Sequence, residues 1–298
     1  MPKKAIVIDG NSLIYRAFYA TGNQLAYYKS HNLPPVNALK LVLLIILKLV
    51  HETEYDYALV AFDHQKKTLR HDTFADYKAG RKPMPEELVY QLPLIKEAVD
   101  IIGIKNISME GIEADDLIGS FVKIMNKDNV EVEIYSSDRD MLQLVNDKTV
   151  VKLFKTGISD IQTVSLKNFS EIFHGLTPQQ VIDFKGISGD SSDNLCGIRG
   201  VGPTTASALI KQYHSLDGIY ASLDQLSPAL QSKFNHSKET AYMCRNLSII
   251  QTNSLDDKIL NYFIKQPTNK RALRNLIYKY HFTGLDKYLD DIQSNIFE

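Results

Sequence analysis

The sequence predicts an α/β fold, a mostly parallel sheet flanked by helices, followed by a helical region. Apolar strand-like runs alternate with amphipathic helical patterns up to about residue 163, which is typical of parallel βαβ units. After that point strand signals fade, and helix-like segments joined by Gly- and Asp-rich turns remain. The composition is ordinary, with 44% hydrophobic and 23% charged residues among 298, so we expect a globular protein of one large or two smaller domains.

The expected strands are short apolar runs, and helical patterns separate most of them. We place strands at residues 4–8, 57–62, 104–109, 130–135 and 150–154. The helices of this part are expected near 10–20, 36–53, 86–102 and 114–126. Later helices are expected near 165–174, 178–184, 203–213, 217–222, 237–249 and 269–281. The predicted domains are therefore an α/β part at residues 1–165 and a helical part at 166–298.

Bulk properties limit the class of protein. The net charge of -1 argues only weakly against nucleic acid, because basic residues can line one face while acids line a pocket. Cys196 and Cys244 form no metal or redox motif, which favours a reducing cytoplasm. The apolar stretch 39–50 contains lysines and is shorter than the roughly 20 residues that span a bilayer. The N-terminus leads directly into a strand, so we expect a soluble, cytoplasmic protein with no signal peptide and no membrane partner.

Carboxylates gather in five small groups, at strand ends, at the start of one helix and in one Gly-rich loop. The nine residues are Asp9, Asp63, Glu113, Asp115, Asp116, Asp138, Asp140, Asp190 and Asp193. In an open parallel sheet the carboxyl ends of the strands meet along one edge, so most of these acids are expected in one patch. A lone acid at a strand end is usually a turn or cap residue, but such a patch repels itself unless hard divalent cations bind there.

A long basic connection, residues 64–85, follows Asp63. Within 64–82 its cationic residues outnumber the acidic Asp72 and Asp76; they are Lys66, Lys67, Arg70, Lys78, Arg81 and Lys82. Most charge runs are solvated surface helices, but a segment this long beside a candidate metal ligand is typical of a functional arch or lid. If the segment is helical, Lys78 and Arg81 share one face of it.

The Gly-rich turn 197–202 precedes the helix-like segment 203–213, and residues 186–213 together resemble a helix–hairpin–helix. Backbone N–H groups at a helix N-terminus bind phosphate whatever the base, so such a unit suits duplex DNA. The alternative is a tight connection between helices that requires positive φ angles.

Six motifs, in this order, resemble the 5′–3′ exonuclease and flap endonuclease family. The likeness is greatest to the N-terminal nuclease domain of bacterial DNA polymerase I and its free-standing relatives. It runs from about residue 4 to about residue 250 and implies a PIN-like nuclease core. The motifs are VIDGNSLIYRAFYA, VAFD, TLRHDTFADYKAGR, GIEADDLIG, SSDRDML and GDSSDNLCGIRGVGPTTA.

The resemblance implies two Mg²⁺ or Mn²⁺ ions. A first ion would be held by Asp9, Asp63, Glu113 and Asp115, with Asp116 alongside. A second would be held by Asp138, Asp140, Asp190 and Asp193, with Asp115 able to bridge. Two such ions are a common apparatus for hydrolysing phosphodiester bonds.

The resemblance also implies contacts with DNA. Lys78 and Arg81 would meet the scissile phosphate, with Arg70 and Tyr77 beside them. Tyr15 would stack on a base, unless it is core packing, and Arg16 would meet a phosphate. The helix–hairpin–helix would grip the duplex, with K⁺ on its carbonyls, through Gly197, Gly200, Gly202, Thr204 and Lys211. The family usually has Pro at the position of Cys196 and Lys at that of Thr204, so we expect weaker duplex affinity rather than lost chemistry.

The implied activity is a structure-specific 5′ nuclease that cuts DNA, or RNA-primed DNA, at junctions of single strand and duplex during primer removal and repair. The implied partners are DNA with a 5′ end or flap and a DNA polymerase, and a monomer is expected. Three alternatives stay open: a junction-binding protein with weak catalysis, a PIN-like ribonuclease, and an interaction protein whose acids bind Ca²⁺. No Walker motif indicates an ATP-dependent step.

Overall fold

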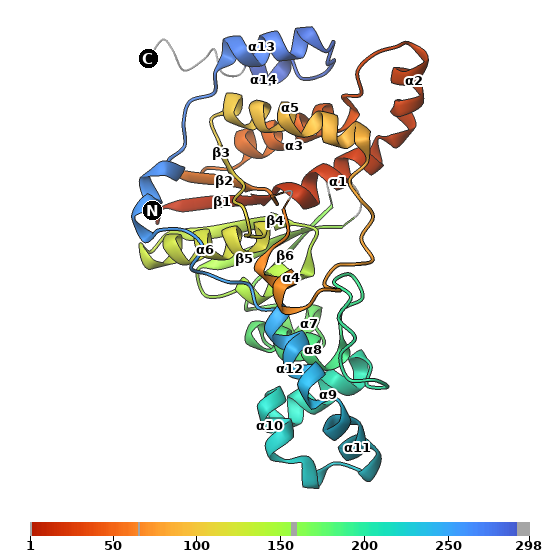
Figure 1. The fold of residues 1–298 in the computed structure, drawn as a ribbon. Helices are drawn as coiled ribbons and strands as arrows, with labels where there is room; N and C mark the ends of the chain where they lie inside the picture. Colours follow the sequence, from red (N-terminus) through yellow and green to blue (C-terminus); the bar gives the residue numbers. More distant parts are fainter. Residues whose placement is uncertain (1, 65, 156–159, 291–298) are drawn as a thin grey trace.

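Figure 1 shows the fold in the computed structural model, which describes residues 2–64, 66–155 and 160–290. Residue 65 of the predicted arch and residues 291–298 of the predicted helical part lie outside this description. The sheet has the strand order β3-β2-β1-β4-β5-β6. Its strands are β1 (Lys4–Asp9), β2 (Tyr57–Ala61), β3 (Lys105–Ile107), β4 (Glu131–Ser136), β5 (Thr149–Phe154) and β6 (Ile161–Val164).

The first five strands are parallel, which confirms the predicted α/β fold class. The short edge strand β6 is antiparallel to β5 and was not predicted. Strand β1 lies at the centre, where Ile8 is paired with Val60 of β2 and with Tyr135 of β4. The carboxyl ends of β1, β2 and β4 therefore lie side by side, and the acids that follow them are brought to one edge.

Helices cover both faces of the sheet (Figure 1). One face carries α1 (Gly10–Ala20), α3 (Asn37–Glu52) and α5 (Glu86–Ile102), and the other carries α6 (Ala114–Lys127). Side chains along β1 alternate between the two cores: Ile6 and Ile8 pack with α1, α3 and α5, while Ala5 and Val7 pack with α6. Because both faces are covered, β1 and β2 are continuous apolar runs.

A helical region lies at the end of the sheet where β1, β2 and β4 terminate. It contains α7 (Phe169–Ile172), α8 (Val181–Ser188), α9 (Pro203–Tyr213), α10 (Leu216–Ala221), α11 (Pro228–His236) and α12 (Lys238–Leu247). Two further helices outside this region, α2 (Leu25–Ser30) and α4 (Leu69–Thr73), were not predicted, and neither was α11. Short 3₁₀ turns are η1 (Gly22–Gln24), η2 (Arg139–Leu144), η3 (Pro178–Gln180), η4 (Leu223–Gln225) and η5 (Asp257–Phe263).

After α12 the chain returns to the α/β part. Phe263 packs edge-on against Phe121 of α6, with ring centroids 5.0 Å apart. Helices α13 (Lys270–Lys279) and α14 (Lys287–Asp290) then lie beside α5 and α3 (Figure 1), and Leu273 and Ile277 join their core. Within the described ranges, no helix combines the length and the apolar character needed to cross a bilayer.

Candidate active site

A cavity of about 1710 Å³ opens where β1, β2 and β4 end. Its walls come from α1, the basic arch, the start of α6, η2 and the loop between α8 and α9. Six of the nine predicted acids line it: Asp9, Asp63, Asp115, Asp138, Asp140 and Asp190. The edge of the parallel sheet therefore gathers most of the carboxylates, as expected from the strand ends.

Helix N-termini hold the first acids in place. Asp9 is the N-cap of α1 and accepts from the Ser12 amide at 2.9 Å and from the Ser136 hydroxyl at 2.6 Å. Asp63 accepts from the Ala114 amide, at the start of α6, and from the Asn11 side chain, both at 2.8 Å. These donors stabilise negative charge and fix both carboxylates against the cavity.

Burial and mutual repulsion make this group of acids costly to ionise. Burial, reinforced by Asp138 and Asp63, raises the pKa of Asp9 to about 7. Burial, with Asp138 and Asp9 nearby, raises the pKa of Asp115 well above its usual range. The pKa of Asp63 is raised by burial as well. A divalent cation that neutralises these buried, mutually repelling carboxylates would strongly stabilise their ionised form.

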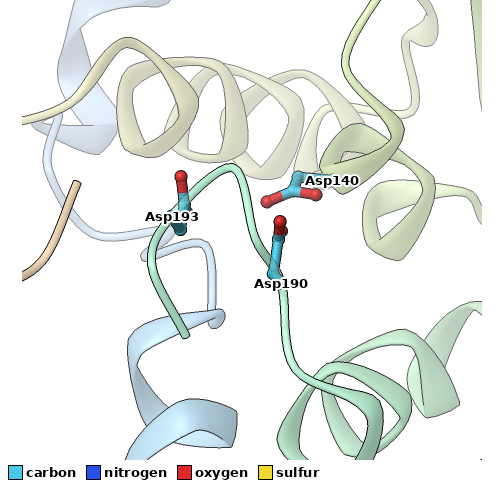
Figure 2. A group of neighbouring side chains, drawn as sticks. All are labelled: Asp140, Asp190 and Asp193. Carbon is cyan, nitrogen blue, oxygen red and sulfur yellow. The ribbon is translucent and has the colours of Figure 1, made fainter. Parts of the chain in front are cut away.

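A second group of acids faces the first from the α8–α9 side of the cavity. Figure 2 shows Asp140 pointing toward Asp190, with Asp193 on the same loop as Asp190. One carboxylate oxygen from each of the three lies within 4.8 Å of the others. The loop is closed by paired backbone hydrogen bonds between Asp190 and Leu195, of 2.7 and 2.8 Å. This all-oxygen donor set fits a hard cation such as Mg²⁺ or Mn²⁺.

Lys185 of α8, which the sequence analysis did not single out, lies in the second group. Its ammonium donates to Asp140 and, at 2.6 Å, to Asp190. Burial alone would lower the pKa of Lys185, but these two carboxylates raise it, so the side chain stays charged. Lys185 sits five residues before Asp190 within an otherwise apolar turn of helix, which was the only signal in the sequence.

The three remaining acids, Glu113, Asp116 and Asp193, contact the arch instead of lining the cavity. Asp116 accepts two hydrogen bonds from the Arg70 guanidinium, both of 2.7 Å, and one from the Gln251 amide. Glu113 accepts from Lys78 at 2.8 Å and lies 3.3 Å from Arg70. Burial would raise the pKa of Glu113, but Lys78 and Arg70 hold it below its usual value.

The arch is a short helix followed by a turn. Lys78 has a φ of 57°, a left-handed conformation, so residues 78–81 are not helical and the condition for Lys78 and Arg81 to share a helix face is not met. The Lys78 amide donates instead to the Asp193 carbonyl at 3.1 Å, and Arg81 donates to the Asp193 carboxylate at 2.7 Å. Both side chains line the cavity, because the acidic loop fixes the end of the arch.

Arg70 and Tyr77 are interior supports of the arch. Beyond its pair with Asp116, Arg70 donates to the carbonyls of Leu247 and Ile249 at 3.0 and 2.7 Å. Tyr77 is 3% exposed, and its hydroxyl donates to Asp193 at 3.0 Å. Both side chains therefore support the arch beside Lys78 and Arg81, and their contacts with DNA stay a prediction.

Helix α1 lines the opposite wall. Tyr15 faces the cavity, and its ring stacks on that of Tyr19, with centroids 6.4 Å apart and an interplanar angle of 19°. Tyr19 was not predicted, although its spacing of four residues from Tyr15 is the signal for a shared helix face. It is 68% exposed and lines the same cavity. Arg16 also lines it and donates to the Phe154 and Lys155 carbonyls.

The connection between α8 and α9 is a compact hairpin. Gly197 and Gly200 have φ angles of 59° and 76°, and Gly202 is the N-cap of α9. A Cβ atom on Gly197 would lie 2.3 Å from the Gly189 amide nitrogen, so the approach of the two helices requires glycine. Thr204 lies in the first turn of α9 and Lys211 in its last, and neither lines the cavity.

Known proteins match both parts of the chain. Residues 4–174 match the N-terminal resolvase-like domain of 5′–3′ exonucleases, and residues 176–270 match the C-terminal SAM fold of the same enzymes. A 5′–3′ exonuclease of Mycoplasma pneumoniae is 44% identical over 284 residues, which cover 95% of this chain and 97% of that protein. DNA polymerase I of Bacillus subtilis is 40% identical over 253 residues, 85% of this chain but only 28% of that protein.

Solved structures share the fold. The 5′-exonuclease of T5 with bound zinc ions superposes with a TM-score of 0.68 at 20% identity, covering 98% of both chains. The catalytic core of Rad2 in complex with DNA substrate superposes with a TM-score of 0.64 at 14% identity, covering 98% of this chain and 93% of that one. At these identities the likeness concerns the arrangement of the elements alone.

Proposed function

The chain belongs to the 5′–3′ exonuclease family, and we propose that it cuts DNA, or RNA-primed DNA, at the junction between a 5′ single strand and duplex. The observation that carries the proposal is the convergence of carboxylates from five separate segments on one cavity that also receives Lys78 and Arg81. An acidic cavity by itself repels a phosphodiester. The neighbouring cations, together with divalent ions, make it able to bind one.

The two acidic groups suit two Mg²⁺ or Mn²⁺ ions. Asp9, Asp63 and Asp115 would hold the first ion, Asp140, Asp190 and Asp193 the second, and Asp138 lies between the groups. Such ions lower the pKa of a bound water and neutralise charge on phosphate oxygens. Glu113 and Asp116 would then position the arch instead of binding an ion, because Glu113 pairs with Lys78 and Asp116 pairs with Arg70.

Lys78 and Arg81 are the groups that would stabilise the reacting phosphate. Lys78 supplies a compact point charge and Arg81 a planar fork that can contact two phosphate oxygens. Both line the cavity and pair with carboxylates beside it, Lys78 with Glu113 and Arg81 with Asp193. Tyr19 offers an exposed ring and stacks on the half-buried Tyr15, so the pair is a platform on which an unpaired base can stack. Arg16, at the same wall, is the proposed contact for a neighbouring phosphate.

The helical region would hold the duplex away from the cut. The α9 N-terminus at Gly202 and Thr204 presents backbone N–H groups, and Lys211 adds a cation at the far end of the helix. The K⁺ ion of the proposal would bind backbone carbonyls of residues 197–202. The Gly200 carbonyl already accepts from Lys233 at 2.9 Å, so that ion would use other carbonyls.

The cellular role that follows is removal of primers and 5′ flaps in the cytoplasm. A nuclease of this kind leaves a gap or nick, so its work is followed by a DNA polymerase. We further propose that the protein acts as a monomer. Its α/β part, divided from the helical part near residue 165, would supply most of the metal-binding acids, and the helical part would add Asp190 and Asp193.

The substrate is tested by single-turnover cleavage in Mg²⁺ of four molecules of one sequence: a 5′-flap DNA, single-stranded DNA, duplex DNA and single-stranded RNA. We expect the flap to be cut fastest, by at least about tenfold, because only a junction engages both the cavity and the hairpin. Faster cleavage of the RNA would support a PIN-like ribonuclease instead. Tight binding of the flap with no cleavage would support a junction-binding protein.

A further inference from the structure

Lys185 occupies the place where the second group of acids would hold its ion. Its side chain is 10% exposed, and it lies on α8 at the cavity wall. The ammonium bridges Asp140 and Asp190, two of the three carboxylates in Figure 2. A lysine ammonium has three donors and no acceptor, so each of these contacts uses lone pairs on a carboxylate oxygen. A divalent cation at the same position needs those oxygens as well.

The first group of acids is neutralised differently. Of the ion pairs that the described part of the chain forms, none involves Asp9, Asp63 or Asp115. The two groups of acids therefore differ, before any divalent ion binds, in whether a cationic side chain pairs with them. Asp9 and Asp63 of the first group accept from hydroxyl, amide and backbone donors, whereas the second group already contains a covalently tethered cation.

We propose that Lys185 is a built-in counter-ion that a divalent cation must displace from Asp140 and Asp190 before the second metal position can fill. This inference rests on the proposed nuclease function and concerns the order in which its ions bind. It makes the position between Asp140, Asp190 and Asp193 the weaker of the two in the absence of DNA. It also makes Lys185 a positioning residue, because it keeps the acidic loop closed in the metal-free protein.

The test counts Mn²⁺ ions bound to the full chain without DNA, by electron paramagnetic resonance of the free ion. The variant is Lys185→Met, and the matched control is Lys152→Met, whose ammonium lies 3.4 Å from Glu133 on the sheet. We expect Lys185→Met to tighten the weaker site by at least about tenfold, because the competing charge is gone. The Kd of the tighter site for Mn²⁺ should stay at its wild-type value in Lys185→Met. In Lys152→Met, the Kd of both sites should stay at the wild-type value.

Thermal unfolding gives a second readout. In EDTA, Lys185→Met should unfold at a lower temperature than the wild type, since Asp140 and Asp190 then repel each other. The rise in Tm on adding Mn²⁺ should be larger in the variant, because more binding energy is gained. If Lys185→Met does not fold in EDTA, Lys185→Gln removes the charge but keeps a donor. Lys185→Arg keeps the charge, so its weaker site should remain weak.

The outcomes separate this inference from the proposed function. If Lys185→Met and Lys185→Gln bind the second Mn²⁺ no more tightly than the wild type, while the wild type cuts flap DNA, the role of Lys185 is overturned and the nuclease stands. If the wild type binds no divalent ion at either position and cuts nothing, both proposals fail together.

Discussion

Lys78 and Arg81 line the cavity, and each pairs with a carboxylate beside it, Lys78 with Glu113 at 2.8 Å and Arg81 with Asp193 at 2.7 Å. These pairs hold the two cations beside the acids without neutralising the acids that line the cavity. Burial would lower the pKa of Lys78, but Glu113, Asp193 and Asp115 raise it, so Lys78 stays charged at neutral pH. The arrangement suits groups that act on a phosphate rather than on a proton.

Replacing either cation by alanine should therefore slow the chemical step. For Lys78→Ala and Arg81→Ala we expect single-turnover cleavage of flap DNA to fall by about 10²–10³-fold, as for the loss of one donor to a reacting oxyanion. The Kd for the flap should change by less than about tenfold, since many other phosphates are contacted. The exposed Lys82→Ala on the same arch is the control. A variant that loses binding and cleavage in equal proportion would show a general electrostatic role instead.

The raised pKa of Asp9 predicts how stability depends on pH. The native carboxyl has its pKa raised to about 7, above the ordinary value of 3.8, so folding takes up a proton between these two values. In EDTA, the contribution of Asp9 to stability should be largest below pH 4 and should be lost progressively as the pH rises through 7.

Thermal unfolding at pH 5.5 and pH 8 checks this expectation. Tm in EDTA should fall by a few degrees between them, and the fall should shrink in Asp9→Asn and in saturating Mg²⁺. The exposed Asp147→Asn is the control and should keep the wild-type fall. An unchanged fall in Asp9→Asn would mean that other groups set the pH dependence.

Residue roles could be predicted from the sequence only where the backbone alone sets the direction of a side chain. Asp9 and Asp63 follow parallel strands, so their edge of the sheet was known in advance. Asp115 and Asp116 are neighbours on a helix, where successive residues point about 100° apart. Asp115 lines the cavity and Asp116 pairs with Arg70. No pattern in the sequence shows which of the two acids faces the cavity.

At the scale of elements, the hairpin between α8 and α9 depends on the conformation of single glycines. Gly197 combines a φ of 59° with backbone atoms of Gly189 and Ile187 at 2.3 and 2.6 Å from a hypothetical Cβ. Gly202 has an ordinary φ of -89°, and nothing lies within 4 Å of its Cβ position. The two glycines of one motif therefore have different physical requirements.

Gly197→Ala should lower the free energy of unfolding by at least about 1–2 kcal/mol, since alanine is strained at this φ and the hairpin must open. Gly202→Ala should leave stability almost unchanged, and chemical denaturation of both variants checks the difference. The reverse ranking would mean that the hairpin is not packed as described.

The arch shows what the spacing of charges leaves open. Lys78 and Arg81 would share a face only if residues 78–81 were helical, but the helix ends at Thr73 and Lys78 adopts a positive φ. The reason is a tertiary contact, because the Lys78 amide donates a hydrogen bond to the Asp193 carbonyl, more than 100 residues later in the chain. Lys185 escaped prediction for the same reason, because the packing of α8 against η2 decides what its ammonium meets.

The whole molecule has an α/β part and a helical part that lie side by side in Figure 1. One cavity is lined by residues of both parts. The alternation of strand and helix patterns predicted the parallel sheet correctly, and the central strands β1 and β2 are buried on both faces. The return of the chain after α12 was not predicted. The helical pattern of α13 shows that it has an apolar face, but not that this face packs on α5.

The account depends most on the cavity acids acting with divalent ions to cut DNA. The decisive measurement is cleavage of a 5′-labelled double-flap DNA by the wild type in Mg²⁺, by the wild type in EDTA, and by Asp63→Ala in Mg²⁺. We expect a short labelled fragment in the first reaction only, with Asp63→Ala slower by at least about 10²-fold. Equal cleavage by Asp63→Ala, or cleavage that persists in EDTA, would contradict the account.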